Sequence, residues 1–236
     1  MASRLKQLTR RYLPWLRSAR AYRQAPIAGI RVHYKRHLDG GGRSFGQGFI
    51  PFLQAHNMPR QPRVFEWCAG PGFIGFSLLA HGLCDKLCLA DINPEAVAAC
   101  RRTIADNGLS GQVSVYQSDN LASIPATERW DLVVANPPHF DDDEYRGELR
   151  THDPGWRIHR EFFRTVTPFL QPGGVIVLQE NNSGSTAETF RGMIEEAGLK
   201  IAFVQGCEPT ITAHSRFFYI GIVRAGDNVP AWAKTG

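Results

Sequence analysis

The stretch RVFEWCAGPGFIG, residues 63–75, decides the fold, because it joins two apolar runs through a pair of closely spaced glycines. Residues 63–67 predict a buried strand, and residues 72–81 predict the helix that follows it. Gly70 and Gly72 allow the backbone to turn tightly and a ligand to approach it closely. A strand that leads through such a turn into a helix N-terminus is typical of a doubly wound α/β sheet.

The same alternation continues toward the C-terminus. It predicts strands at residues 86–90, 113–116, 131–135, 174–179, 201–205 and 216–224, and helices at residues 94–107, 156–169 and 186–197. A hairpin-like link between the last two strands makes the final strand antiparallel. We therefore predict an α/β fold with a doubly wound, Rossmann-like sheet of about seven strands and a short N-terminal helical or lid segment.

The first 60 residues follow a different pattern. It predicts a helix at residues 4–22 and a strand at residues 30–34, followed by the glycine-rich stretch DGGGRSFGQGF, residues 39–49. Phe45 and Gly46 are the candidates for a lid over a bound cofactor, although an ordinary glycine-rich connection has the same composition. We divide the chain into a basic N-terminal arm with lid, residues 1–60, and an α/β domain, residues 61–236.

Charge is distributed unevenly along the chain. The formal net charge is +5, yet residues 1–38 hold ten Lys or Arg and no acid, which leaves 17 basic against 22 acidic side chains in the rest. Such an arm attracts nucleic acid, phosphate-bearing partners or acidic substrates, and a solvated basic face or an organelle transit peptide has a similar composition.

The sequence contains neither an apolar run long enough to span a membrane nor a secretory signal, so we expect a cytoplasmic protein that does not bind membranes. Its five cysteines are irregularly spaced, which indicates reduced thiols. Cys84 and Cys88 have no second pair of Cys or His at zinc-finger spacing, so we expect no metal site.

Acidic residues end three successive strands of the predicted sheet. Glu66 precedes the glycines, where it would repel a pyrophosphate and favour a cationic ligand. Asp91, in LADIN, is placed to hold ribose hydroxyls, with Ile92 as an apolar wall for a base. Asp119 and Asn120, in QSDN, end the third strand and can reach an adenine amino group. These residues predict a site for a positively charged nucleoside without phosphates.

Residues 61 to about 224 resemble the class I S-adenosylmethionine-dependent methyltransferases through VFEWCAGPGFIG, LADINPEAV, SDNL and DLVVANPPHF, in that order. The resemblance implies S-adenosyl-L-methionine as the cofactor. It implies that Gly70 and Gly72 line the methionine moiety, that Asp91 holds the ribose and that Asp119 reaches the adenine. The fourth motif resembles the N-P-P-[YFW] of the amino-methyltransferases, which include HemK-like glutamine methyltransferases and nucleic-acid base methyltransferases.

The motif NPPHF, residues 136–140, suits a planar NH₂ acceptor. Such a nitrogen is a poor nucleophile, and the Asn136 side-chain oxygen and the Pro137 carbonyl can each accept one of its N–H bonds and hold it in line. Asn136 also counts among the predicted cofactor contacts. His139 stands where the family has an aromatic residue; it can stack on the acceptor, take a proton, pair with a carboxylate, or merely enter a helix.

The acceptor is predicted from the segments around this motif. The HemK-like enzymes imply a larger helical domain ahead of the fold, and here about 60 residues precede it. Four acids, residues 141–144, follow the motif and would repel a duplex, so we expect a small-molecule, amino-acid-like or peptide acceptor rather than nucleic acid. The alternative is a protein glutamine or basic residue, or an RNA base, which the basic arm favours. A non-catalytic binding module and an NAD-dependent oxidoreductase are the remote alternatives.

Overall fold

The computed structural model describes residues 21–44, 46–142, 144, 147–148, 150–206 and 217–234. Residues 1–20, which include most of the predicted N-terminal helix, lie outside this part of the chain, and so does the lid candidate Phe45. None of the helices in the described part is long and apolar enough to cross a membrane.

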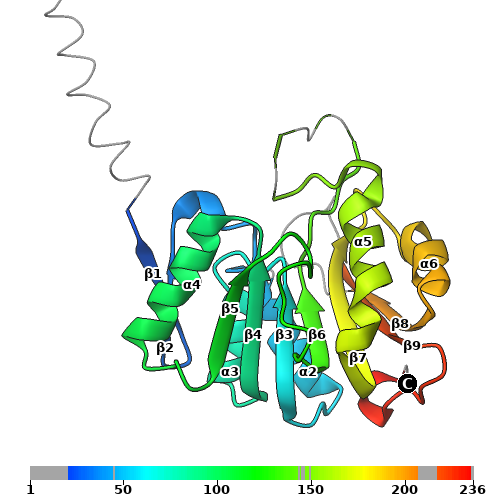
Figure 1. Cartoon of the computed structure of the whole chain (residues 1–236), viewed down its shortest axis with the longest axis horizontal. Coiled ribbons are helices and arrows are strands. Elements are labelled where there is room, and N and C mark those ends of the chain that lie inside the picture. Colours follow the sequence, from blue (N-terminus) through cyan, green and yellow to red (C-terminus); the bar gives the residue numbers. More distant parts are fainter. Residues whose placement is uncertain are drawn as a thin grey trace, which may run out of the picture.

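A seven-stranded sheet forms the centre of the molecule, with the strand order β5-β4-β3-β6-β7-β9-β8 (Figure 1). The strands are β3 (Gln61–Trp67), β4 (Cys84–Asp91), β5 (Val113–Gln117), β6 (Trp130–Ala135), β7 (Leu170–Asn181), β8 (Leu199–Gly206) and β9 (Phe217–Arg224). Neighbours from β5 to β7 pair in parallel, whereas β9 is antiparallel to β7 and β8. The predicted doubly wound sheet with an antiparallel last strand is confirmed.

Helices cover both faces of this sheet, with α5 and α6 in front of it in Figure 1 and α2 and α3 behind. Their bounds are α2 (Phe49–Ala55), α3 (Phe73–Ala80), α4 (Pro94–Asp106), α5 (Arg157–Val166) and α6 (Ala187–Glu196). Short 3-10 turns cover Arg36–Leu38, Gly46–Gly48, Pro154–Trp156, Thr167–Phe169 and Ala231–Ala233. The segment predicted as one helix, residues 156–169, thus consists of the end of a 3-10 turn, then α5, and then a second 3-10 turn.

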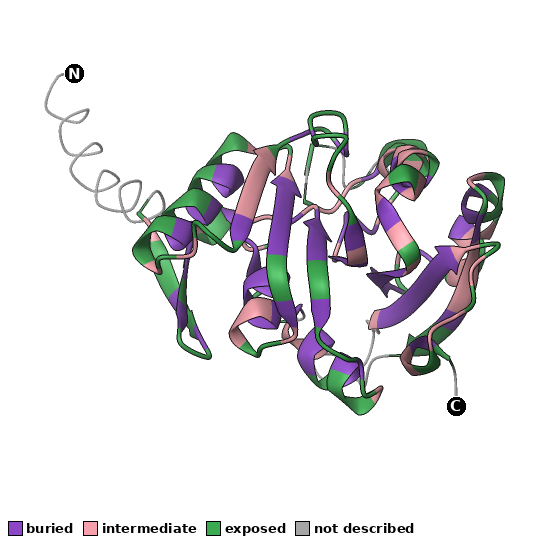
Figure 2. Cartoon of the chain, turned by 60° about the horizontal axis from the view of Figure 1, so that its bottom comes forward, coloured by how far each residue is buried: buried purple, intermediate pink, exposed green. Residues whose placement is uncertain are grey.

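The core has two layers, one on each face of the sheet. On β3, Val64 packs in the layer that contains Phe76 of α3, and the next residue, Phe65, packs in the layer that contains Phe162 of α5. This alternation is that of a strand whose two faces are both covered. Figure 2 colours most of the central strands as buried.

A hairpin of β1 (Arg23–Ile27) and β2 (Ile30–Tyr34) packs beside α4. The backbone N–H of His33 donates to Thr103 Oγ1 at 2.8 Å, and Val32 is fully buried in the same core layer as α3. The strand at residues 30–34 agrees with the sequence prediction, whereas β1 was not predicted. The core of the α/β domain thus includes residues that precede the boundary predicted at residue 60.

Candidate active site

A cleft lies at the carboxyl ends of the parallel strands, where β3 has β4 on one side and β6 on the other. This is the switch point of the sheet, at which doubly wound folds bind their ligands. The cleft has a cavity volume of about 180 Å³. The predicted site residues that line it are Glu66, Gly70, Asp91, Ile92, Asp119, Asn120 and Asn136. Gly46, Gly72, Pro137 and His139 do not belong to the described lining.

The glycine turn takes the backbone into a left-handed conformation. Gly70 has φ +52° and Gly72 has φ +79°, values that favour glycine. Gly72 caps α3, and a Cβ atom there would lie 2.8 Å from the ring of Phe76. Gly72 therefore supports the cleft from behind, while Gly70 lines it.

Asp91 joins the end of β4 to this turn. Its Oδ2 accepts a hydrogen bond from the backbone N–H of Gly70 at 2.7 Å, and its Oδ1 accepts one from Asn93 at 2.8 Å. Burial raises the pKa of the Asp91 carboxyl group, against the effect of these two donors. Ile92, the next residue, is 52% exposed at the cleft, as expected of an apolar wall for a base.

Glu66 holds the helix that follows the turn. Its carboxylate accepts hydrogen bonds from the backbone N–H groups of Gly75 at 2.7 Å and Ile74 at 3.3 Å. Burial outweighs both donors and raises the pKa of Glu66 to about 8. Both oxygens of Glu66 thus accept hydrogen bonds from α3. The predicted contact of Glu66 with a cationic ligand stays a prediction.

Asp119 and Asn120 occupy different surroundings. Asp119 has a 54% exposed side chain at the cleft mouth, 3.9 Å from Arg157. The Asn120 amide is committed to the fold: its oxygen accepts from Trp67 Nε1 at 2.9 Å, and its nitrogen donates to the Ile158 carbonyl at 3.2 Å.

Asn136 lies directly beyond β6, at the edge of the cleft. Its Oδ1 is buried and has no hydrogen-bond partner among the described residues. Leaving such an acceptor unpaired typically costs about 1–3 kcal/mol. Pro137 and Pro138, both buried, stiffen the backbone beyond it.

His139 faces away from the cleft into a buried chain of charges. Its Nδ1 lies 3.2 Å from Glu180 Oε2, and Glu180 Oε1 lies 3.1 Å from His159 Nε2. His159 Nδ1 in turn lies 2.7 Å from Asp153 Oδ2. Of the roles that the sequence left open for His139, the geometry matches pairing with a carboxylate. The sequence analysis did not identify Glu180, His159 and Asp153. For Glu180, the signal that it passed over is a carboxylate two residues beyond the apolar run 175–178.

These residues fit S-adenosylmethionine. The glycine turn brings backbone close to the cleft, Asp91 presents a carboxylate, Ile92 offers an apolar surface, and Asn136 offers an unused acceptor. Residues 35–200 match the family model of the methyltransferase small domain, and the chain belongs to that family. The predicted family, the class I S-adenosylmethionine-dependent methyltransferases, and its cofactor are confirmed.

Curated relatives act on components of translation. The release factor glutamine methyltransferase of Cereibacter sphaeroides is 29% identical over 148 residues, 58% of this chain and 52% of that one. The ribosomal RNA small subunit methyltransferase C of Alcanivorax borkumensis is 32% identical over 129 residues, 55% of this chain and 35% of that one. The chain thus spans about half or less of the length of these relatives.

Solved structures show the same fold. The 16S rRNA N2 G1207 methyltransferase of T. thermophilus, in complex with AdoMet and guanosine, has a TM-score of 0.57 at 18% identity, over 85% of this chain and 50% of that one. TYW2 of M. jannaschii, in complex with AdoMet, has a TM-score of 0.57 at 16% identity, over 86% of both chains.

The relatives correct the predicted partner. We expected a small molecule or peptide in preference to nucleic acid, and this prediction is wrong, because the relatives are named for protein glutamine and for ribosomal RNA. The error came from giving the acidic loop after NPPHF more weight than the basic arm.

Proposed function

We propose that this member of the family is an active S-adenosylmethionine-dependent methyltransferase and that it acts on the exocyclic amino nitrogen of an RNA base. The observation that carries the proposal is Asn136, which lines the cofactor cleft and whose buried Oδ1 has no hydrogen-bond partner among the described residues. S-adenosylmethionine supplies an electrophilic methyl group when bound. Asn136 would accept one N–H bond of the planar NH₂ group, which orients its nitrogen and favours the loss of its conjugation.

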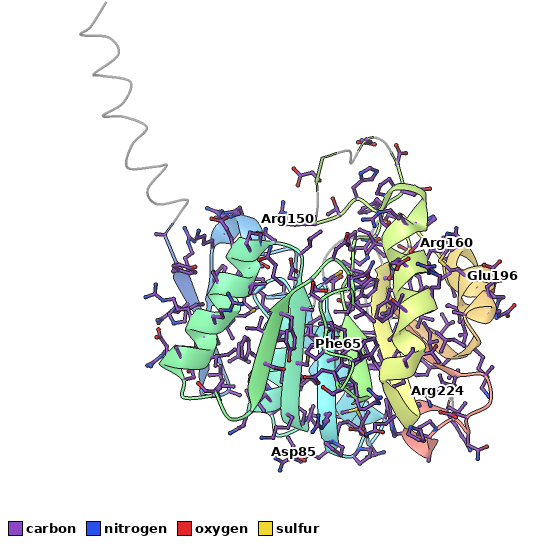
Figure 3. The ribbon with its side chains drawn as sticks, in the orientation of Figure 1. Phe65, Asp85, Arg150, Arg160, Glu196 and Arg224 are labelled. Atoms are coloured by element: carbon purple, nitrogen blue, oxygen red, sulfur yellow. The ribbon has the colours of Figure 1, made fainter. Side chains whose placement is uncertain are left out.

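Positive charge near the cleft supports a nucleic-acid acceptor. Arg150 and Arg157 both line the cleft. Figure 3 shows Arg150 beyond one end of the strands and Asp85 at the opposite end. In the sequence, residues 1–38 contain ten basic side chains and no acid, and residues 1–20 of this arm lie outside the described part of the chain. The phosphate groups of a nucleic acid bind favourably to basic side chains of this kind.

Two carboxylates of the acidic loop accept hydrogen bonds from nearby backbone groups. Asp141 Oδ1 accepts a hydrogen bond from the backbone N–H of Gly155, and Asp142 Oδ1 accepts one from Glu144 at 2.9 Å. These carboxylates therefore organise the backbone of their own loop.

A protein glutamine is the second candidate. Its side-chain amide carries the same planar NH₂ group, and the relative from Cereibacter sphaeroides is named for this acceptor. An RNA base and a glutamine side chain differ in the groups that surround the NH₂ group. Asn136 would accept an N–H bond from either acceptor.

Labelled methyl transfer separates them. The protein is incubated with methyl-labelled S-adenosylmethionine and with ribosomal subunits, deproteinised RNA or purified release factors, and each product is digested with nuclease or protease. We expect label that nuclease releases as a methylated nucleoside and that Asn136→Ala abolishes. Protease-released methylglutamine would establish the second candidate. Label on neither class of acceptor would contradict the proposal.

A further inference from the structure

Basic side chains gather on the hairpin of β1 and β2, on the 3-10 turn that follows it and on α4, which lie side by side in Figure 1. These side chains, called here the hairpin–α4 surface, are Arg31, Lys35, Arg36, Arg101 and Arg102. We propose that the hairpin–α4 surface binds the phosphate backbone of the RNA whose base enters the cleft. This inference rests on the proposed function.

The two acids of the same elements, Glu95 and Asp106, are already paired with basic groups of the fold. Glu95 lies 2.5 Å from Lys35 Nζ and 2.7 Å from His37 Nε2. Hydrogen bonds from these two partners lower the pKa of the Glu95 carboxyl group. Asp106 lies 3.8 Å from Arg102 Nε. Each acid thus has a cation beside it, which reduces its repulsion of a phosphate group.

Three arginines of the hairpin–α4 surface have no such partner. Arg31, Arg36 and Arg101 are exposed, and their guanidinium groups form neither a hydrogen bond nor an ion pair with the described residues. A guanidinium group is always charged at neutral pH, and its planar set of donors matches the oxygens of a phosphate group. These three groups can therefore bind a polyanion without breaking an existing pair.

Contacts between the hairpin and α4 hold the basic side chains in one surface. The Tyr22 ring has Lys35 Nζ 5.4 Å and Arg102 Cζ 4.9 Å from its centroid. The Asn107 side chain, directly beyond α4, bonds to both the backbone N–H and the carbonyl of Arg31, each at 3.0 Å. Groups that are already held in place lose less conformational freedom when a ligand binds them.

The hairpin–α4 surface reaches the mouth of the cofactor cleft. Leu38, two residues beyond Arg36, lines the cleft, and so does Arg150. Arg150 Nη1 donates to the Asp39 carbonyl at 3.2 Å, so the turn that carries Arg36 adjoins the loop beyond NPPHF. An RNA strand that leaves the cleft on this side therefore passes Arg36 and then the arginines of α4.

The test is the affinity for RNA as a function of salt concentration. The probe is a fluorescently labelled single-stranded RNA of mixed sequence, and the full chain is saturated with S-adenosylhomocysteine. The test variant combines Arg31→Gln, Arg36→Gln and Arg101→Gln. We expect its affinity at low salt to fall by about tenfold or more. The slope of log affinity against log salt concentration should flatten by about 2, because each phosphate contact to a single strand contributes roughly 0.7.

The matched control combines Arg63→Gln, Arg129→Gln and Arg160→Gln, which changes the net charge equally. These arginines are exposed and lie near the amino ends of β3 and β6 and on α5. Both triple variants should bind S-adenosylhomocysteine like the wild type, and the control should also keep its affinity for RNA. An equal loss in the control would show that only the net charge matters, and it would overturn the proposal.

Further outcomes decide the proposal as well. Wild-type affinity and slope in the test variant would overturn it, and so would a wild-type protein that does not bind RNA. If the triple variant lost S-adenosylhomocysteine binding, the three single variants would replace it, each with an expected flattening of about 0.7. A polyglutamate peptide is the second probe, and an effect of the test variant on this peptide alone would assign the surface to an acidic protein and overturn the proposal.

Methyl transfer to RNA separates this inference from the proposed function. Weaker RNA binding with a flatter slope in the test variant, without methylation of any RNA, would contradict the proposed function alone. Methylation of RNA, with unchanged RNA binding in the test variant, would contradict this inference alone.

Discussion

His159 of α5 and Glu180 of β7 form an ion pair at 3.1 Å in which neither side chain is exposed. Asp153 contacts the other nitrogen of the same imidazole at 2.7 Å. Removing the cation leaves two carboxylates buried without their partner, which typically costs about 3–5 kcal/mol. We therefore expect His159→Gln to lower the free energy of unfolding by that amount in urea titrations. Arg164→Gln, which removes an exposed pair with Glu161, is the control and should change it by less than about 1 kcal/mol.

The same imidazole makes stability depend on pH. Burial opposes its charge, yet Glu180 and Asp153 outweigh burial and raise the pKa of His159 to about 9, from an ordinary value of 6.5. The native state thus holds a proton that the unfolded state releases, so the stabilisation is complete below pH 6.5 and is lost as the pH rises through about 9. Unfolding free energies measured across this range should fall more steeply in the wild type than in His159→Gln. Parallel curves would contradict this assignment.

Asp91 provides a test of the cofactor site. Asp91→Ala removes a charged acceptor at the end of β4, so we expect the affinity for S-adenosylhomocysteine to fall at least about tenfold in calorimetry. Asp91→Asn keeps the shape of the side chain but not its charge, so its affinity should lie between those of the wild type and Asp91→Ala. Asp85→Ala changes an exposed carboxylate at the opposite end of the same strand and should leave the affinity unchanged. Equal affinity in Asp91→Ala would refute the ribose assignment.

The basic arm can be tested by truncation. Residues 1–20 contain six Lys or Arg and precede β1, so their removal leaves the hairpin strands in place. We expect the truncated protein to bind S-adenosylhomocysteine normally and to bind RNA more weakly, with a smaller dependence of affinity on salt, because fewer counterions are released. Unchanged RNA affinity and salt dependence would show that the arm has another task.

The sequence predicted the sheet because each strand from β3 to β9 contains a short stretch rich in apolar residues, with glycine, proline or polar residues near its ends. It missed β1, whose residues RQAPI include a proline and a charged start and are stabilised by pairing with β2. Asn136 could be predicted because it follows its strand directly. The pairing of His159 with Glu180 could not, because those residues lie 21 positions apart and are joined only by packing of α5 on β7.

His139 illustrates the same limit. Its position in NPPHF indicated contact with the acceptor, but the direction of its side chain depends on Glu180, a residue 41 positions away. His152 also lines the cleft and was not predicted, since a lone histidine in a long polar loop carries no periodic signal. Its β-bridge to Phe140 is a tertiary contact.

The most direct test of the account is single-turnover methyl transfer by Asn136→Ala, with cofactor affinity measured on the same protein. Asn136 is one of several predicted cofactor contacts, and the adenosyl contacts are expected at the ends of other strands, so the affinity for S-adenosylmethionine should fall far less than the rate of transfer. Loss of a preorganised acceptor should slow transfer by about 10²- to 10³-fold, by analogy with oxyanion-hole donors. That combination is the predicted result. A wild-type rate in Asn136→Ala would show that NPPHF only ends a strand and would contradict the proposed amino-group chemistry.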